Sequence, residues 1–125
     1  MGRIRREIIV AESPRWTVFD GGARKTYVTR ETAEDCVLQP VPRPTEALFG
    51  GQRHQIDHTC ILFGEIDGHY FDTQACVVDQ IGADESGRQI DVLFGALAMQ
   101  LYSIHLDMLN ERLDLTHDTT EFIEF

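Results

Sequence analysis

Short β-type segments separated by two-residue turns constrain the fold of this sequence more than any other feature. Gly50-Gly51 suits the primed turns of a β-hairpin, and Asp67-Gly68 is a strong two-residue turn signal. A third hairpin is predicted around Asn110-Glu111. Strands and helices do not alternate along the chain, which argues against a doubly wound parallel sheet. The pattern therefore predicts an all-β fold.

Helices are few in this pattern. One short helix is predicted over residues 96–102, which are rich in Ala, Leu, Met and Gln, and a weaker one over residues 29–36, where Thr29 suits the N-cap. Residues 39–44 contain three prolines and are predicted to form an extended connection rather than a helix or a central strand. Strands are predicted over residues 7–11, 15–20, 46–49, 52–58, 59–67, 69–80, 91–94, 104–108 and 112–116.

Composition argues against several classes of function. With 125 residues, of which 42% are hydrophobic, the chain can bury a core, and residues 1–125 are predicted to form a single domain. The formal net charge of −10 argues against binding to nucleic acid or to an anionic membrane as the main function. The longest uncharged apolar run, residues 92–101, is about half as long as a membrane span requires.

The cysteines and the charge distribution add two expectations. Cys36, Cys60 and Cys76 are odd in number and widely spaced, which fits a reducing, cytoplasmic location better than a disulfide framework. Seven of the basic residues fall within the first thirty positions, whereas residues 118–125 are acidic and aromatic. The alternating pattern of residues 121–125 suits an edge strand that pairs with a partner, and it fits a frayed terminus equally well.

A carboxylate stands at the end of one predicted strand. The apolar run over residues 16–19 leads directly into Asp20, which is followed by Gly21, Gly22 and Ala23. In a tight turn of this kind, backbone N–H groups can hold an ionised carboxylate, and Gly22 allows a substrate or a second chain to approach closely. Taken alone, however, Asp-Gly-Gly is only a turn signal and also fits the tip of a hairpin.

The neighbouring motifs make the chain similar to the retropepsin-like aspartic proteases. In that family an apolar strand ends in Asp-Thr-Gly-Ala or Asp-Ser-Gly-Ala, which residues 20–23 resemble. Residues 91–98, in which apolar residues and a glycine precede a short helix, resemble the second signature of the family. Residues 46–58 stand where the family has its flap hairpin, and residues 104–115 resemble the closing hairpin of the bacterial branch. The resemblance spans residues 7–117.

The resemblance implies a retropepsin-like acid protease barrel with a single lobe and one short helix after Leu93-Phe94-Gly95. Because one lobe supplies one carboxylate, two copies are expected to pair about a two-fold axis with Asp20 facing Asp20. The two carboxylates would share one proton, so that the ionised one activates a water and the protonated one polarises the scissile carbonyl. The expected function is that of a homodimeric aspartic endopeptidase that hydrolyses peptide or protein substrates without a cofactor or a metal.

The same resemblance implies roles for three short segments besides Asp20. Phe49 fits a hydrophobic lid of the flap, although an aromatic residue at a surface turn is an equally good interpretation. Leu93, Phe94 and Ala23 fit the walls of apolar pockets, although they fit the core equally well. The implied site consists of the catalytic Asp20, the active-site loop Gly21, Gly22 and Ala23, the flap residues Phe49, Gly50 and Gly51, and the pocket residues Leu93, Phe94 and Gly95.

One residue departs from the family pattern. The position after the acid is Thr or Ser in the family, where its hydroxyl braces the two active-site loops across the dimer, whereas here it is Gly21. Losing that brace costs about 1 kcal/mol or more per site. A second hypothesis is therefore a catalytically silent dimer that binds peptide or protein partners in the same groove. A small β-barrel unrelated to proteases is a third hypothesis.

Other candidate sites are weaker. Asp72-Thr73-Gln74-Ala75 resembles the family triplet, but Gln74 replaces the glycine of the tight turn, and the segment is predicted to lie in the middle of a strand. His54 and His58 suggest a metal site, but residues four apart in a strand are separated by about 13 Å. No metal site is therefore predicted.

Overall fold

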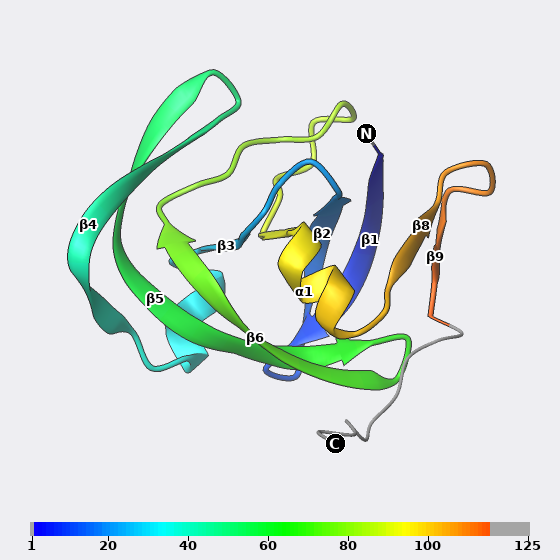
Figure 1. Cartoon of the computed structure of the whole chain (residues 1–125), viewed down its shortest axis with the longest axis horizontal. Coiled ribbons are helices and arrows are strands. Elements are labelled where there is room, and N and C mark those ends of the chain that lie inside the picture. The colour runs from blue at the N-terminus through cyan, green and yellow to red at the C-terminus, as the bar shows by residue number, and fades with distance from the viewer. Residues whose placement is uncertain (1, 116–125) are drawn as a thin grey trace.

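The computed structural model describes residues 2–115. Most of these residues lie in β-strands, and the two helices are short (Figure 1). No helix within this range is long and apolar enough to span a membrane. In chain order the elements are β1 (Arg3–Val10), β2 (Ser13–Asp20), β3 (Thr26–Thr29), the 3-10 helix η1 (Thr32–Asp35), β4 (Gln39–Phe49), β5 (Gln52–Ile66), β6 (His69–Val78), β7 (Val92–Phe94), α1 (Ala96–Leu101), β8 (His105–Asp107) and β9 (Arg112–Asp114).

Seven of the strands form one sheet that closes on itself. Their order is β1-β2-β7-β3-β6-β5-β4, and the end of β1 also pairs with β5, with Ile9 opposite Glu65 and Val10 opposite Gly64. β8 and β9 form a separate antiparallel hairpin that lies beside β1 (Figure 1). Closing the sheet encloses a core on its inner face and places β4 at the sheet edge.

Aromatic residues from three strands meet in this core. Phe19 of β2 contacts Phe94 of β7, with ring centroids 4.9 Å apart, and Phe71 of β6 meets the same Phe94 ring edge to face at 5.4 Å. All three side chains are fully buried. Burial and contact of such rings stabilise a small fold strongly. The core therefore fixes β2, β6 and β7 relative to one another, including the end of β2 that carries Asp20.

Both predicted glycine turns form β-hairpins. Gly50 and Gly51 have φ values of +59° and +73°, which favour glycine, and they join β4 to β5. Asp67 and Gly68 have φ values of +50° and +84° and join β5 to β6. These two hairpins are confirmed at the predicted residues.

The strands of the β4–β5 hairpin extend further than predicted. β5 is one continuous strand rather than the two strands predicted. Residues 57–59 in its middle are half-buried, and the alternation of buried and exposed residues resumes after them. The proline-rich residues 39–44 belong to β4 and not to a connection. Prolines are tolerated there because β4 lies at the sheet edge, where its pairing with β5 is irregular between Pro40 and Thr45.

The predicted helices are confirmed in position but not in extent. α1 covers all but the last residue of the predicted segment 96–102. At residues 29–36 the structure forms only the 3-10 helix η1, whose N-cap is Glu31 and not the predicted Thr29. Thr29 still accepts a hydrogen bond from the Thr32 N–H at 3.3 Å. The predicted hairpin near the C-terminus is present as β8 and β9. The edge strand predicted over residues 121–125 lies outside the described residues.

The pairing of β2, β7 and β3 brings the end of β2 close to the start of α1. β2 and β7 are parallel, with Phe19 opposite Phe94, and β7 is antiparallel to β3 on its other side. Because parallel strands end at the same edge of a sheet, Asp20 at the end of β2 and Gly95 directly after β7 lie at neighbouring positions. The turn after β2 therefore lies against the first residues of α1 (Figure 1).

Candidate active site

The carboxylate of Asp20 is buried and held by groups of its own chain. Asp20 is 7% exposed at the end of β2. Its Oδ1 accepts a hydrogen bond from the Gly22 N–H at 2.8 Å, and its Oδ2 lies 3.2 Å from Nε of Arg3. The Ala23 N–H donates to the backbone carbonyl of Asp20 at 3.2 Å. The turn therefore holds one carboxylate oxygen with a backbone N–H and leaves the other beside a cation.

The first residues of α1 hold the loop that follows Asp20. The Ala96 N–H donates to the Ala23 carbonyl at 2.6 Å, and the Leu97 N–H donates to the Arg24 carbonyl at 3.1 Å. Gly95 packs so closely against this loop that a β-carbon there would lie 2.1 Å from the Lys25 carbonyl oxygen. The two sequence signatures thus support each other through backbone contacts, and Gly95 is the residue that permits the close approach.

The start of β1 supports the same loop from a second direction. Arg3 lies opposite Asp20 in the β1–β2 register, and the Gly21 N–H donates to the Gly2 carbonyl at 3.1 Å. A β-carbon at Gly21 would lie 3.9 Å from that carbonyl oxygen and 3.9 Å from Cδ1 of Leu106, both ordinary van der Waals distances. Packing therefore does not require glycine at position 21, and a β-carbon fits there.

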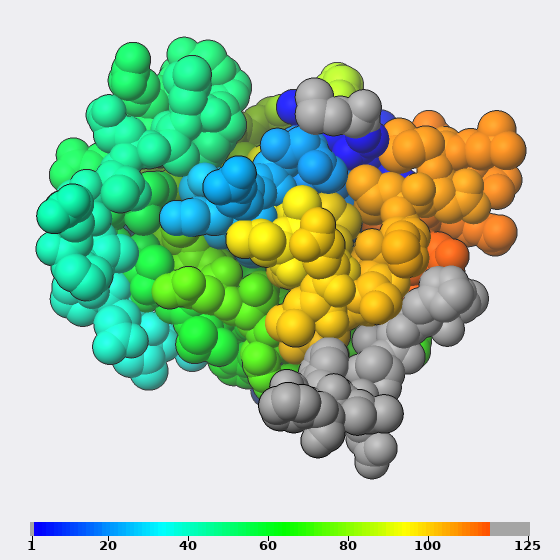
Figure 2. All heavy atoms as spheres, in the orientation of Figure 1, coloured from blue at the N-terminus to red at the C-terminus, as the bar shows by residue number. Residues whose placement is uncertain are grey.

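A cavity of about 680 Å³ lies next to Asp20, which is within the size range of ligand sites in proteins. Three loop segments line it, namely the turn after β2, the tip of the β4–β5 hairpin, and the connection 79–91 between β6 and β7. Residues of β1, β2, β3 and β7 complete the lining. Figure 1 shows that the hairpin and this connection reach the same side of the molecule, and in Figure 2 the hairpin stands out beside the loop that follows β2. Asp20 therefore borders a space large enough for a ligand.

The tip of the β4–β5 hairpin contributes Leu48, Phe49 and Gly50 to the cavity wall, and Gly51 completes the turn. The Phe49 ring stacks on His54 with centroids 4.0 Å apart and contacts the Tyr27 ring at 5.2 Å. Phe49 is thus packed against its own chain while it lines the cavity, which favours a wall over a free lid. Leu48 is 68% exposed, and no sequence pattern had pointed to it.

The predicted pocket residues divide between the cavity and the core. Leu93 and Ala23 line the cavity, whereas Phe94 is fully buried among Phe19 and Phe71. The reason is the alternation of side chains along a strand, which sends Leu93 and Phe94 of β7 to opposite faces. Gly95 acts beneath the loop and does not line the cavity. The sequence was compatible with a pocket wall and with the core for these residues. Leu93 and Ala23 are wall residues, and Phe94 is a core residue.

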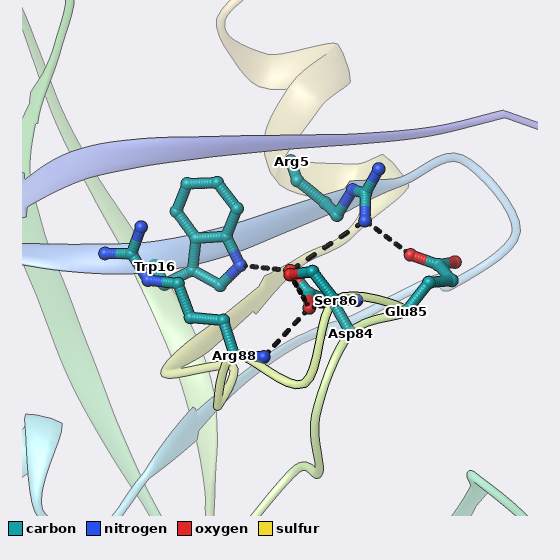
Figure 3. Close-up of polar contacts among 6 residues, drawn as sticks. All are labelled: Arg5, Trp16, Asp84, Glu85, Ser86 and Arg88. Atoms are coloured by element: carbon teal, nitrogen blue, oxygen red, sulfur yellow. Dashed lines mark hydrogen bonds and ion pairs between the residues drawn. The ribbon is translucent and has the colours of Figure 1, made fainter.

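Asp84 organises the connection 79–91, and sequence reasoning missed it. Its Oδ1 accepts hydrogen bonds from the Ser86 hydroxyl at 2.7 Å, the Ser86 N–H at 2.9 Å and the Arg88 N–H at 3.0 Å (Figure 3). Its Oδ2 accepts one from the Trp16 indole N–H at 2.7 Å. The Ser86 hydroxyl contributes most to lowering the pKa of Asp84 to about 2, against an opposing effect of burial. Spacing could not identify this cluster, because Trp16 and Asp84 are distant in the sequence.

The Asp84 cluster fixes one wall of the cavity to β1 and β2. Arg5 of β1 lies 3.8 Å from Asp84 Oδ2 and 2.5 Å from Glu85 Oε2 (Figure 3). The Arg88 guanidinium lies 4.0 Å from the centre of the Trp16 ring, a cation–π contact. Ile81, Ala83 and Ile90 of the same connection line the cavity. The middle of this wall is therefore held against β1 and β2.

The weaker candidate sites lie apart from the cavity. Asp72 is exposed within β6, where its N–H donates to the Tyr102 hydroxyl at 2.9 Å and its Oδ2 accepts from the Tyr70 hydroxyl at 3.1 Å. This position agrees with the prediction that Asp72 lies inside a strand. His54 and His58 both lie in β5. Among residues 2–115 there is no group of three potential metal ligands.

The cysteines are placed as structural residues. Cys60 and Cys76 are buried and Cys36 is half-buried, all with free thiols. Burial is the main cause that raises the pKa of Cys60 to about 12, and burial also raises the pKa of Cys36 and that of Cys76. Because the thiolate is the nucleophilic form, these thiols are poorly suited to nucleophilic catalysis.

Comparison of the sequence with protein-family models and with curated proteins finds no match. The structure, by contrast, is similar to solved structures. The retroviral protease-like domain of Ddi1 from Leishmania major aligns with a TM-score of 0.65 and 16% identity, over 91% of this chain and 88% of that chain. The EIAV protease, solved with the inhibitor HBY-793, aligns with a TM-score of 0.60 and 13% identity, over 82% of this chain and 89% of that chain.

A third similar structure is that of the foamy viral protease-reverse transcriptase with an RNA/DNA hybrid. It aligns with a TM-score of 0.55 and 10% identity, over 80% of this chain and 12% of that much longer chain. The expected fold class is thereby confirmed, and the hypothesis of an unrelated β-barrel is wrong; the assignment to the bacterial branch stays a prediction. The chain is all-β and single-lobed and has the retropepsin-like fold.

Proposed function

We propose that this chain is the subunit of a homodimeric aspartic endopeptidase, in which Asp20 of both subunits activates the water that hydrolyses an extended peptide. The observation that carries this proposal is the buried Asp20 carboxylate beside a cavity of about 680 Å³, in a fold shared with a retroviral protease. Burying a carboxylate costs free energy, so a buried carboxylate that borders a cavity is a candidate for chemistry.

In the proposed mechanism a second copy of the chain supplies the second carboxylate. Two carboxylates within hydrogen-bond distance do not both ionise, so the pair holds one proton. The ionised member takes a proton from the water as general base while the water oxygen attacks the scissile carbonyl carbon, and the protonated member donates a hydrogen bond to the carbonyl oxygen. The tetrahedral intermediate then collapses: the C–N bond breaks, and the departing nitrogen takes up a proton from the carboxyl pair. The Gly22 N–H, 2.8 Å from Oδ1, keeps each carboxylate oriented during both steps. No covalent intermediate forms.

The substrate class follows from the lining of the cavity. Tyr27, Phe49, Ile81 and Leu93 offer apolar surface, which suits apolar side chains near the scissile bond. The β4–β5 hairpin can pair its main chain with that of an extended peptide and exclude water from the site. The cytoplasmic location and the exclusion of nucleic-acid and membrane partners stay predictions from composition.

The proposal is tested by cleavage of a mixed peptide library between pH 4 and pH 7. Wild-type protein should produce cuts that resist inhibitors of serine proteases and metalloproteases and that disappear in Asp20→Asn. Asp72→Asn is the matched control, because Asp72 resembles the motif but is exposed within β6. Cleavage that persists in Asp20→Asn, or that Asp72→Asn removes, overturns the assignment of Asp20.

Two observations favour a second candidate function, that of a catalytically silent dimer that binds peptides in the same groove. Gly21 lacks the hydroxyl that the family uses as a brace. In addition, Arg3 lies against Asp20 Oδ2, the oxygen that a second carboxylate or a water would need. A binding module requires the groove and the hairpin but no free carboxylate oxygen.

The two candidates are separated by restoring the side chain at position 21. The structure leaves room for the β-carbon of such a side chain, which would meet its neighbours at 3.9 Å. Gly21→Thr should raise the rate of Asp20-dependent cleavage several-fold if the chain is a weak enzyme. The same substitution should leave a pure binding module inactive. Gly21→Ala serves as the control that fills the space without adding a hydroxyl.

A further inference from the structure

Six charged residues line the cavity, and within residues 2–115 the side chains of all but one have a partner. Arg3 lies 3.2 Å from Asp20, and Arg5 lies between Asp84 and Glu85. The Asp84 carboxylate also accepts hydrogen bonds from Trp16, Ser86 and Arg88. The exception is Arg24, whose side chain makes no hydrogen bond or ion pair in this part of the chain. The formal charges of the lining sum to zero, and Arg24 is the charged side chain of the lining that has no partner among residues 2–115.

The backbone of Arg24 is held firmly although the residue is exposed. Its carbonyl accepts the hydrogen bond from the Leu97 N–H at 3.1 Å, and the carbonyl before it accepts one from the Ala96 N–H at 2.6 Å. Gly95 packs beneath the same stretch, where a β-carbon would lie 3.0 Å from the Arg24 carbonyl oxygen. Arg24 is thus anchored four residues after Asp20, and only its side chain needs to be ordered by a ligand.

We propose that Arg24 recognises an acidic side chain of the bound peptide, so that the groove selects apolar segments flanked by Glu or Asp. A guanidinium binds a carboxylate through two parallel hydrogen bonds, a geometry that lysine and neutral residues do not reproduce. The apolar lining beside Arg24, which includes Val18, Tyr27 and Leu93, accepts the neighbouring apolar side chains. This inference rests on the proposed function in that both use the same groove.

The acidic character of the whole chain does not strongly oppose the binding of an acidic peptide side chain at Arg24. The net charge of −10 is spread over the molecule, and at physiological ionic strength its field is screened beyond about 8 Å. A carboxylate in direct contact with Arg24 lies inside that distance. A polyanion such as a nucleic acid, by contrast, extends over the acidic surface and is repelled. A short peptide with one or two acidic residues therefore fits the charges better.

A homodimer would place one Arg24 at each end of the groove. Because the two subunits are related by a two-fold axis, a bound peptide would meet one Arg24 guanidinium from each subunit, one on either side of the scissile bond. Acidic residues should therefore be favoured on either side of the apolar segment. A basic residue at the same position should be disfavoured, since it would bring two like charges together.

The test measures peptide binding separately from cleavage. Fluorescently labelled peptides with an apolar centre carry Glu, Gln or Lys, placed at one flanking position at a time, and are titrated with Asp20→Asn protein at pH 6.5. At one or more positions on each side, the Glu peptide should bind five- to tenfold more tightly than the Gln peptide, and the Lys peptide more weakly than both. The difference should decrease as salt is added.

Variants of Arg24, made in the Asp20→Asn background, identify the residue responsible. Arg24→Gln should remove the preference for Glu, Arg24→Glu should reverse it toward Lys, and Arg24→Lys should retain part of it. Arg43→Glu is the matched control, because Arg43 is exposed on β4 and lies outside the cavity lining. The control should keep the full preference.

The outcomes separate this inference from the proposed function. Binding without charge preference, a preference that survives in Arg24→Gln, or no binding of any peptide at millimolar concentration overturns the inference. Asp20-dependent cleavage by wild-type protein without a preference for acidic flanks leaves the protease standing and removes the role of Arg24. A preference that depends on Arg24, without any cleavage, supports the inference and favours the binding module.

Discussion

Two buried carboxylates of this chain have opposite surroundings. Asp84 receives four hydrogen bonds and lies near Arg5, so its charge is satisfied within the connection 79–91. Asp20 receives one hydrogen bond from the Gly22 N–H, and its second oxygen faces the exposed side chain of Arg3. The carboxylate of Asp84 has all its hydrogen bonds within the protein, so its role is structural. Asp20, which borders the cavity with fewer donors, keeps capacity for a ligand or a second carboxylate.

Asp84→Asn should lower the melting temperature by several degrees at pH 7. The folded state holds the pKa of Asp84 at about 2, below the ordinary value of 3.8, so the ionised carboxylate stabilises the fold above about pH 4. That stabilisation is lost as the pH falls from about 4 to about 2. The difference in melting temperature between wild type and variant should therefore shrink between pH 7 and pH 2.5, as thermal melts followed by circular dichroism would measure.

Asp79→Asn is the control for that experiment. Asp79 lies in the same connection, but its side chain is 87% exposed and pairs with Arg30 at 3.2 Å. An exposed ion pair of this kind contributes little to stability. If Asp79→Asn and Asp84→Asn lower the melting temperature equally, the Asp84 cluster does not hold the connection in the way described.

Arg3→Gln should raise the turnover number of Asp20-dependent cleavage several-fold. The substitution removes the cation beside Asp20 Oδ2 and frees that oxygen for the second carboxylate and the water. Stability should change by no more than about 1 kcal/mol, because the Arg3 side chain is 70% exposed. Steady-state kinetics on a peptide found in the library assay measure the effect. Arg6→Gln is the control, because Arg6 lies on the same strand as Arg3 but pairs with Asp67 in the turn between β5 and β6.

The opposite result would assign Arg3 a different role. A fall in turnover number in Arg3→Gln, with the fold intact, would mean that the cation orients Asp20 for reaction. Unchanged kinetics would mean that the ion pair is released in the dimer and has no effect on the reaction.

At the scale of elements, the sequence allowed prediction of the parts that depend on neighbouring residues. The hairpins at Gly50-Gly51 and Asp67-Gly68 and the helix after Gly95 depend on local turn and helix preferences, and all three are present. The length of β4 was missed because prolines normally end strands, and only the position of β4 at the sheet edge allows them. The pairing of β1 with β5 leaves no local signal.

The candidate site was predictable to a similar extent. Asp20, Gly22 and the hairpin tip were predicted from the resemblance of the neighbouring motifs to the retropepsin-like family, because Asp-Gly-Gly and Gly-Gly by themselves indicate only turns. Arg3, Arg24 and the Asp84 cluster could not be predicted, because their roles depend on contacts between segments that are far apart in the sequence. Trp16 and Asp84, for example, are 68 residues apart and still share a hydrogen bond of 2.7 Å.

Gly95→Ala should destabilise the fold by about 1–3 kcal/mol, the usual cost of forcing an extra group into a packed region. A β-carbon there would lie 2.1 Å from the Lys25 carbonyl oxygen and 2.5 Å from its carbon, and these backbone atoms cannot rotate away. Urea denaturation measures the change. Gly21→Ala, at a position with room for a β-carbon, should change the free energy of unfolding much less. Equal effects would contradict the close packing of Gly95.

At the scale of the whole molecule, a single chain supplies only half of the proposed catalytic pair. The cavity, the hairpin and the anchored loop are present in one copy, but general acid and general base must come from two carboxylates. Activity and assembly are therefore linked in the proposed enzyme. The relation between them can be measured without a structure of the dimer.

Mixing wild-type protein with an excess of Asp20→Asn should reduce cleavage below that of the same amount of wild type alone. Mixed dimers contain one carboxylate in place of two, so subunits drawn into them are lost to the reaction. Initial rates at a fixed wild-type concentration and increasing amounts of variant measure the effect, after equilibration of the mixture. Excess Asp72→Asn, whose dimers keep both Asp20 residues, should not reduce the rate. A rate independent of added Asp20→Asn would contradict a shared site.

The hydrogen bonds from Ala96 and Leu97 to the loop after Asp20 also determine when the site can form during synthesis. That loop leaves the ribosome early, but the residues that anchor it are made more than seventy positions later. The same holds for β2, whose parallel partner β7 begins at Val92. A nascent chain that has not yet reached Leu97 therefore carries Asp20 without these supporting contacts. In the proposed enzyme, the loop beside Asp20 therefore takes its anchored form only after α1 has been made.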